Sequence, residues 1–175
     1  YTHRHADQTH GINELRVFSL KNKKKIPIIA DFNTKKSLYN NFKYCFKSEN
    51  DGYKPILKFS KFKKKHIIKC GIKNLSIRNV SVKHGKINSL AYIINNKCAY
   101  LPDVNKIYPK DLPLFKNLKY LVIDCLQYNY HPSHFSLEDV LSLIKILKPK
   151  KTILTNLHYD MDYDYLIKIL PKNVI

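Results

Sequence analysis

The chain has 175 residues, of which 44% are hydrophobic, and its formal net charge at neutral pH is +19. A chain of this length and apolar content predicts one domain, residues 1–175, with a sizeable core. It contains no run of about 18 apolar residues and no apolar leader before a small-residue cleavage site, so we expect neither a membrane span nor a signal peptide. These features predict a soluble, cytoplasmic protein with no membrane partner.

The positive charge comes almost entirely from lysine and is spread along the chain. Clustered lysines bind nucleic acids by releasing counterions from phosphate groups. Many Asn, Ile and Tyr residues accompany these lysines, which is also typical of an AT-rich coding bias. The densest runs, residues 21–25 and 61–65, adjoin predicted turns and are typical of solvated strand ends. Nucleic acid is therefore an alternative partner and not the favoured one.

The four cysteines lie at least 25 residues apart and form no C-x-x-C pair. Three of them lie inside apolar runs that have the pattern of strands or of a helix face. We therefore expect reduced, buried thiols, as is usual in a cytoplasmic protein.

The first 50 residues alternate between extended and helical patterns. Residues 1–3 have the pattern of a strand end that runs into a polar loop, and residues 12–18 that of a short helix. Residues 26–30 predict a buried strand, and Thr34 is the expected N-cap of a following helix. The apolar face of that helix comprises Leu38, Phe42, Cys45 and Phe46.

The middle of the chain is rich in strand patterns. Two of its apolar runs are joined across Asn95-Asn96-Lys97, which predicts a hairpin turn. The expected strands are residues 56–59, 66–70, 75–82, 90–94 and 98–101.

After residue 118 the pattern changes to buried strands that alternate with helices. Residues 120–124 form a near-continuous apolar run, typical of a parallel strand, and residues 152–155 form another. Between them Ser136 is expected to cap a helix that ends at Leu147, and a last helical turn covers residues 166–170. Strands and helices on either side of a β-rich block predict an α/β fold in which helices cover mixed sheets.

Three side chains with metal-binding chemistry alternate near the start of the chain, at His3, His5 and Asp7. Two imidazoles separated by one residue can take adjacent positions on one Zn²⁺, Mn²⁺ or Fe²⁺. The carboxylate can then turn toward a second ion or a bound water. The alternative is an ordinary polar loop, since an isolated histidine is more often a core or surface residue than a ligand. The H-x-H-x-D pattern after a predicted strand favours a metal site.

This stretch resembles the metallo-β-lactamase superfamily, whose signature is H-x-H-x-D-H followed by a glycine, here Gly11. Within the superfamily, the chain is most similar to the branch that includes the phosphoribosyl 1,2-cyclic phosphate phosphodiesterases. Four further segments resemble motifs of that branch in the same order. The matching segments are residues 2–16, 82–85, 100–103, 131–137 and 155–163.

The resemblance implies a metallo-β-lactamase-like αββα sandwich, incomplete at its N-terminus and slightly clipped at its C-terminus. It also implies a set of ligands for two ions. Taken singly, His84, Asp103 and His158 are equally explained as a turn residue, a loop cap and a strand-end residue. In the implied set, the first ion is held by His3, His5 and His84, Asp103 bridges, and Asp7 and His158 belong to the second ion.

One position departs from the family pattern, because Gln8 stands where the family has a second-site histidine. A neutral amide oxygen binds Zn²⁺ more weakly than an imidazole does and shifts the preference toward oxygen-binding ions such as Mn²⁺. We therefore expect two divalent ions, zinc or manganese, with a weakened second site in which Gln8 is at most a weak ligand. The alternative is a single ion.

The resemblance implies a metal-dependent hydrolase in which a metal-bound hydroxide attacks a small cyclic or nucleotide-like phosphodiester. Asp7 would orient the nucleophile, and His134 would protonate the leaving group. His131 is the second candidate for that role and, like Arg16, a candidate for substrate contact. The alternative for His131 and His134 is that they only flank the start of a helix.

Two other functions stay open. One is a nuclease of the same fold that acts on RNA, for which the basic charge would form a groove. The other is a metal-poor binding protein that has kept the fold and lost turnover, with Gln8 as the first sign. Exposed sheet edges in an incomplete fold would also favour pairing with a second copy as a homodimer.

Overall fold

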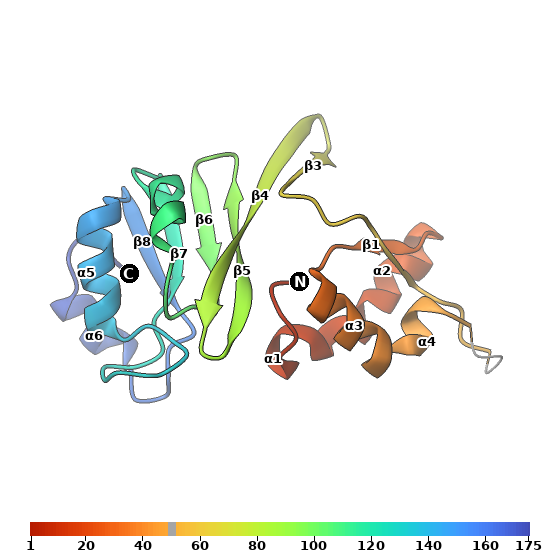
Figure 1. Ribbon diagram of the computed structural model, residues 1–175, viewed down its shortest axis with the longest axis horizontal. Coiled ribbons are helices and arrows are strands. Elements are labelled where there is room, and N and C mark those ends of the chain that lie inside the picture. The colour runs from red at the N-terminus through yellow and green to blue at the C-terminus, as the bar shows by residue number, and fades with distance from the viewer. Residues whose placement is uncertain (49–51) are drawn as a thin grey trace. The chain divides into compact units, whose positions relative to one another are not determined.

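The computed structural model describes residues 1–48 and 52–175, which form two compact units, Tyr1–Lys63 and Lys64–Ile175 (Figure 1). Each unit has a sheet and a hydrophobic core of its own. The expectation of one domain over residues 1–175 stays a prediction. Within the described residues, no helix is both long and apolar enough to cross a bilayer.

The first unit consists of short helices and a small parallel sheet in which Ile26 lies opposite Leu57. Its core contains the buried side chains of Ile12, Leu38 and Cys45, which come from three different helices. These three helices therefore each bury side chains in a small core that belongs to this unit. Its elements are α1 (Ala6–Thr9), η1 (His10–Glu14), α2 (Leu15–Asn22), β1 (Ile26–Ile28), α3 (Phe32–Asn41), α4 (Lys43–Phe46) and β2 (Leu57–Phe59).

Three expectations for the first unit are wrong in detail. The single helix expected to carry Leu38, Phe42, Cys45 and Phe46 is two helices, because Phe42, with a φ of −131°, is not helical and separates α3 from α4. Residues 1–3 belong to no strand: the Tyr1 amino group donates to the Ile29 carbonyl oxygen (2.9 Å), but the chain turns into α1 before a ladder can form. The N-cap of α3 is Asp31 and not Thr34, because the Asp31 carboxylate accepts hydrogen bonds from both the backbone N–H and the hydroxyl of Thr34 (2.9 and 3.0 Å). A carboxylate accepts from the helix start more strongly than a hydroxyl does.

The second unit is built on a six-stranded mixed sheet with the strand order β3-β4-β5-β6-β7-β8. The pairs from β3 to β6 are antiparallel, and β6, β7 and β8 run parallel to one another. This arrangement confirms the predicted β-rich middle and the parallel strands after residue 118. The strands are β3 (Lys65–Cys70), β4 (Lys73–His84), β5 (Ile87–Ile94), β6 (Cys98–Leu101), β7 (Tyr120–Asp124) and β8 (Lys151–Thr155).

Helices η2 (Pro109–Phe115), α5 (Leu137–Leu147) and α6 (Tyr163–Ile169) complete the second unit. The predicted cap of α5 is confirmed, since Ser136 and Asp139 form a reciprocal capping box. The helix buries Val140, Ile144 and Leu147, whose spacing places them on one face, in the same core as the central strands. Helices and a mixed sheet share one core here, as the predicted α/β class requires.

The strand directions decide where loops meet. Because β4 and β6 are both antiparallel to β5, and β6, β7 and β8 are parallel, the carboxyl ends of β4, β6, β7 and β8 lie at one edge of the sheet. In Figure 1 the turn after β4 and the loops after β7 and β8 are at the bottom of this unit. Loops that follow these strands can therefore form a common site.

All four cysteines are free thiols, but they differ in exposure. Cys45 and Cys125 are buried as predicted, and Cys98 is partly buried. The prediction is wrong for Cys70, which is exposed at the end of β3, because β3 is an edge strand that pairs only with β4.

Alkylation should separate Cys125 from Cys70 in the folded protein. Burial, followed by the nearby charges of Asp124 and Asp139, raises the pKa of the Cys125 thiol to about 12. At pH 8.5 fewer than about one in a thousand of its thiols is then ionised, whereas an ordinary exposed thiol is ionised to a substantial degree. We expect iodoacetamide to modify Cys70 within minutes and Cys125 only after denaturation, as measured by peptide mass spectrometry. Equal labelling rates for the two would contradict the buried position.

Candidate metal centre

Side chains with metal-binding or acid–base chemistry collect at the edge of the second unit where four strands end. His84 is the last residue of β4, Asp103 follows β6 by two residues, and Asp124 is the last residue of β7. The loop after β7 adds His134, and the loop after β8 adds His158. The topology thus brings residues up to 74 positions apart in the sequence to one end of the sheet.

Three of these side chains form a compact group. The potential ligand atoms of His84, Asp103 and His134 all lie within 4.8 Å of one another. Asp103 Oδ1 is 4.0 Å from His84 Nε2 and 4.0 Å from His134 Nδ1, and both His84 and Asp103 are buried. Two atoms that each bind one ion at about 2.1 Å can be at most about 4.2 Å apart, so the distance between His84 Nε2 and Asp103 Oδ1 fits shared coordination.

The His84 ring is fixed by its other nitrogen. Nδ1 lies 2.7 Å from the carbonyl oxygen of Ser133, which can only accept a hydrogen bond, so Nδ1 carries the proton and Nε2 is the nitrogen with a lone pair. A metal-binding histidine usually donates its second N–H to a carbonyl or carboxylate in this way. The Ser133 backbone N–H in turn donates to His131 Nδ1 (3.3 Å), which helps to hold the turn in place.

Asn105 connects three loops around this group. Its side-chain oxygen accepts from the Gly85 N–H (2.9 Å), and its side-chain nitrogen donates to the Pro132 carbonyl (3.1 Å). Its own N–H donates to the Lys83 carbonyl oxygen (2.9 Å). The loop that carries Asp103 is thereby attached to the end of β4 beside His84. Asn105 was not predicted as a site residue, because an asparagine in a polar loop has no distinctive local pattern.

Asp124 is a second residue that the sequence analysis missed. It is 0% exposed and accepts three hydrogen bonds, from His134 Nδ1 (2.7 Å), the Val104 N–H (2.9 Å) and the Asn156 side chain (3.1 Å). A buried carboxylate is costly unless it is fully hydrogen-bonded, and here it orients the His134 ring while holding the loop after β6. The available signal was a charged residue in the last position of an otherwise apolar strand.

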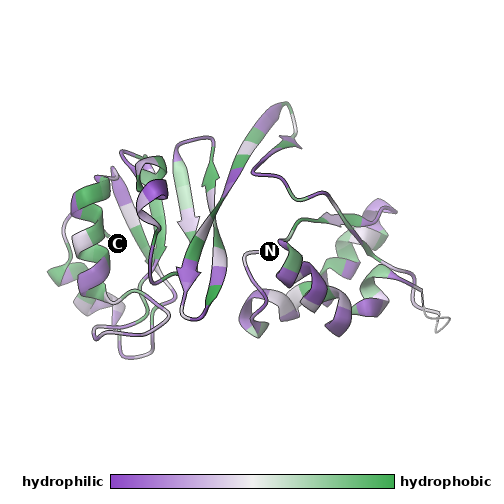
Figure 2. Cartoon of the chain, in the orientation of Figure 1, coloured by the Kyte–Doolittle hydropathy of each residue, from purple (hydrophilic) through white to green (hydrophobic). Residues whose placement is uncertain are grey.

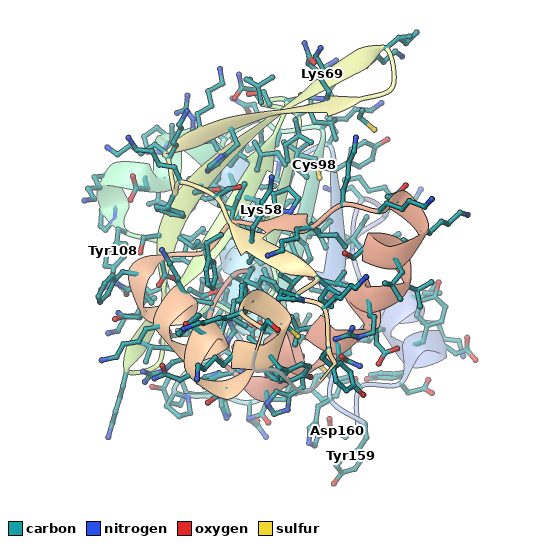
Figure 3. The ribbon with its side chains drawn as sticks, turned by 90° about the vertical axis from the view of Figure 1, so that its right-hand side faces the viewer. Lys58, Lys69, Cys98, Tyr108, Tyr159 and Asp160 are labelled. Atoms are coloured by element: carbon teal, nitrogen blue, oxygen red, sulfur yellow. The ribbon has the colours of Figure 1, made fainter. Side chains whose placement is uncertain are left out.

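His158 lies in the loop after β8. Its backbone N–H donates to the Leu126 carbonyl (2.8 Å), and its Nδ1 is 2.9 Å from an Asp160 carboxylate oxygen. Figure 3 shows Tyr159 and Asp160 projecting from this loop. A carboxylate on Nδ1 leaves Nε2 as the coordinating nitrogen, which suits the predicted ligand role.

The predicted ligands of the first unit lie at its N-terminus. The His3 and His5 rings meet edge to face with centroids 4.4 Å apart, while Asp7 and Gln8 belong to α1. The Gln8 amide nitrogen donates to Asp7 Oδ2 (2.9 Å), and its amide oxygen accepts from the Thr2 hydroxyl (3.4 Å). Gln8 thus orients the neighbouring carboxylate in this arrangement.

The pKa of Asp7 is lowered from its ordinary value. Burial alone would raise this pKa, but the hydrogen bond from Gln8, a backbone hydrogen bond and the charges of His3 and His5 together outweigh it. Asp7 is therefore ionised at neutral pH and has the negative charge that a cation ligand needs.

Two further predicted site residues, Arg16 and His131, have defined neighbours in the structure. Arg16 lies on α2 with its guanidinium 4.7 Å from the centroid of the Tyr53 ring, a cation–π contact, and its role in substrate contact stays a prediction. Burial, together with the neighbouring His134, lowers the pKa of His131. His131 is therefore largely neutral at neutral pH, which fits its nitrogen accepting from Ser133.

Substituting Gly85 should disturb the centre without touching a ligand. Gly85 has a φ of +56°, and a Cβ there would lie 2.8 Å from Ser133 Cβ. Gly85→Ala is expected to cost about 1–3 kcal/mol of stability and to displace the carbonyl that orients His84. Chemical denaturation and a metal titration would measure the two effects. If neither the free energy of unfolding nor the metal affinity changed, the close contact between Gly85 and Ser133 would be contradicted.

A comparison with protein families decides the wider relationship. The model of the beta-lactamase superfamily domain matches residues 1–159, most of the chain. The chain belongs to this family. The match confirms the family resemblance that was inferred from the motifs. It also confirms the predicted metallo-β-lactamase-like α/β fold class. This fold implies the use of divalent metal ions. No curated protein was found that matches the sequence.

Solved structures support the same fold. A new diphosphatase from the PhnP family superposes with a TM-score of 0.85 at 25% identity, over 99% of this chain and 65% of that one. The chain therefore spans less than two thirds of the length of that relative. Human tRNase Z, short form, gives a TM-score of 0.67 at 13% identity, over 92% of this chain and 72% of that one. Unliganded yeast PDE1 gives 0.65 at 18% identity, over 92% and 57%.

Proposed function

We propose that this chain is the metal-binding body of a hydrolase that cleaves a small cyclic or nucleotide-like phosphodiester. The observation that carries the proposal is the group of His84, Asp103 and His134 at the carboxyl edge of the sheet, within 4.8 Å of one another. The family membership and a diphosphatase among the similar structures support this class of reaction. The four free thiols fit a reducing compartment such as the cytoplasm.

The proposed ligands follow the motif order. His3 and His5 would supply two further imidazoles to the ion held by His84, and Asp103 would bridge to a second ion. Asp7 and His158 would hold that second ion, for which Gln8 is a weak additional donor. The donor set of imidazole nitrogens and carboxylate oxygens fits Zn²⁺ and Mn²⁺, and the orienting partners of His84 and His158 fit metal-binding histidines.

The protein side chains have separate proposed roles around the reacting phosphate. Divalent ions held by these residues would supply charge for the phosphate oxygens and would lower the pKa of a bound water. His134, oriented through Nδ1 by Asp124, would use Nε2 to protonate the leaving oxygen. Asp7, held by Gln8, would orient the attacking water. Asp124 acts through His134 and is therefore a positioning residue.

The test is turnover of bis-p-nitrophenyl phosphate and of a small cyclic phosphodiester with added Mn²⁺ or Zn²⁺. We expect activity that is lost with a chelator, restored by the metal, and lost in His5→Ala. His10→Ala removes an exposed histidine of the same segment and should keep the activity. Absence of turnover together with absence of bound metal would reject the proposal and favour a binding protein that has lost catalysis.

A further inference from the structure

β3 and the first half of β4 form a two-stranded ribbon that extends beyond the rest of the sheet (Figure 1). β4 pairs with β3 through residues 73–78 and with β5 through residues 77–84, so the two pairings overlap by only two residues. Figure 2 shows hydrophilic and hydrophobic stretches mixed along the ribbon, and Ile67 and Ile72 are largely exposed. A ribbon of two strands gains little stability by itself in water. The ribbon therefore presents side chains of both its faces to solvent.

Charge is distributed unevenly over the second unit. Residues 65–101, which form β3 to β6, contain no Asp or Glu, whereas residues 120–175 contain six lysines and six acidic residues. A coding bias toward lysine does not by itself remove acidic residues, so it does not explain this contrast. The seven basic residues of the first segment are Lys65, Lys69, Lys73, Arg78, Lys83, Lys86 and Lys97.

The strand register places three of these cations on one face of the ribbon. Lys65 pairs with Arg78 and Lys69 pairs with Asn74, with the pair Ile67 and Ser76 between them. Alternate residues of a strand point to the same side, and directly paired residues share a face. We call this set of six residues the basic face. Figure 3 shows Lys69 near the end of the ribbon.

The ribbon is anchored at its base. The Ser76 N–H donates to the Asn95 side-chain oxygen (2.9 Å), and the Asn95 N–H donates to the Ser76 carbonyl oxygen (2.8 Å). These two bonds connect the ribbon to the turn between β5 and β6. The ribbon is therefore fixed at its base, and the cations of the basic face are held in a defined arrangement.

We propose that the basic face binds the phosphate backbone of single-stranded RNA. Lys65 and Lys69 are four residues apart, roughly 13 Å along the strand, so they can contact separate phosphates. Asn74 and Ser76 add hydrogen-bonding groups beside the cations, which suit the ribose 2′-hydroxyl. The inference is independent of the proposed hydrolase activity.

Two other partners fit these observations less well. A second copy of the chain would bring two acid-free surfaces together, and like charges repel. An anionic membrane favours cations next to one continuous apolar face, whereas the exposed isoleucines here lie on both faces and in the turn.

The experiment measures binding of a fluorescein-labelled 20-nucleotide RNA by anisotropy, with a chelator present so that hydrolysis cannot contribute. The test variant is Lys65→Gln with Lys69→Gln and Arg78→Gln. The control variant, Lys145→Gln with Lys150→Gln and Lys168→Gln, loses the same charge from the neutral half of the unit. We expect the test variant to bind the RNA at least about tenfold more weakly. The slope of log K against log salt concentration should become shallower by about 2, because each lost phosphate contact contributes roughly 0.7. The control should bind as the unsubstituted chain does.

Three results would overturn the proposal. Equal weakening in both variants would show attraction by net charge alone. If DNA of the same sequence bound as tightly as the RNA, the ribose 2′-hydroxyl would contribute nothing to binding. Binding to vesicles of phosphatidylcholine and phosphatidylserine without binding to RNA would assign the ribbon to membranes. Because metal and turnover play no part in this assay, its outcome is separate from the test of the hydrolase.

Discussion

His84→Ala is expected to abolish tight metal binding at the proposed centre and to lower kcat/KM by more than about a thousandfold. The substitution removes an imidazole nitrogen that lies 4.0 Å from the Asp103 carboxylate, and no nearby group of the same turn can replace it. Even a change in a residue that only orients a metal ligand typically costs about 10- to 100-fold in affinity, so loss of the ligand itself should cost more. Elemental analysis and turnover of bis-p-nitrophenyl phosphate measure the two effects.

A matched control for this substitution is His66→Ala, which removes a histidine of β3 from the same sheet. It should keep both the metal and the activity. Circular dichroism of each variant would show whether the fold is retained. If folded His84→Ala bound as many metal ions per chain as the unsubstituted protein does, His84 would not be a ligand.

Asp124→Asn should separate orientation from metal binding. The amide can accept at one oxygen only, so it cannot satisfy His134, the Val104 N–H and the Asn156 side chain together. We expect kcat to fall by about 10²- to 10⁴-fold, the range usual for loss of a general acid, with KM and metal content nearly unchanged. One unsatisfied buried group should also lower the free energy of unfolding by about 1–3 kcal/mol.

Asn156→Gly is the matched control for Asp124→Asn, because glycine tolerates the φ of 64° at this position and the change leaves the bond between Asp124 and His134 in place. It removes the hydrogen bond to the same carboxylate and a contact of 3.3 Å with His134 Nδ1. Its kcat should fall much less. Loss of metal from Asp124→Asn or from His134→Ala would instead make His134 a ligand through Nε2, since Nδ1 donates to Asp124. An unchanged kcat in Asp124→Asn would contradict the positioning role.

Elements with strong local signals could be predicted from the sequence. The run of residues 120–124 and the capped helix from Ser136 both carry their determinants within a few residues, and both are confirmed. The turn at Asn95 and Asn96 is confirmed as well, with φ of 52° and 51°, a region that asparagine tolerates. The N-cap of α3 was misassigned because Asp31 and Thr34 are both good capping residues, and only the geometry decides between them.

The site was harder to predict, because it depends on which strand ends share an edge. The motifs identified His84 and Asp103, but nothing local to Asp124 or Asn105 shows that they connect three loops. These contacts join residues from about 20 to more than 30 positions apart, and they exist only once β4, β6, β7 and β8 are in order. Side-chain periodicity carries no information on that order.

The charge pattern shows the same limit. Over the whole chain, lysine is spread widely enough that nucleic acid was not the favoured partner. Only the strand register shows that Lys65, Lys69 and Arg78 share a face of the ribbon. A property that is diffuse along the sequence can therefore be concentrated on one element of the fold.

One continuous strand, β4, begins in the ribbon and ends at His84. Arg78 and His84 are six residues apart, which corresponds to roughly 20 Å at about 3.4 Å per residue. A single-stranded polynucleotide held at Arg78 would have to extend this distance of roughly 20 Å before one of its bonds came level with His84. An oligonucleotide too short to span it could contact Arg78 or His84, but not both at once.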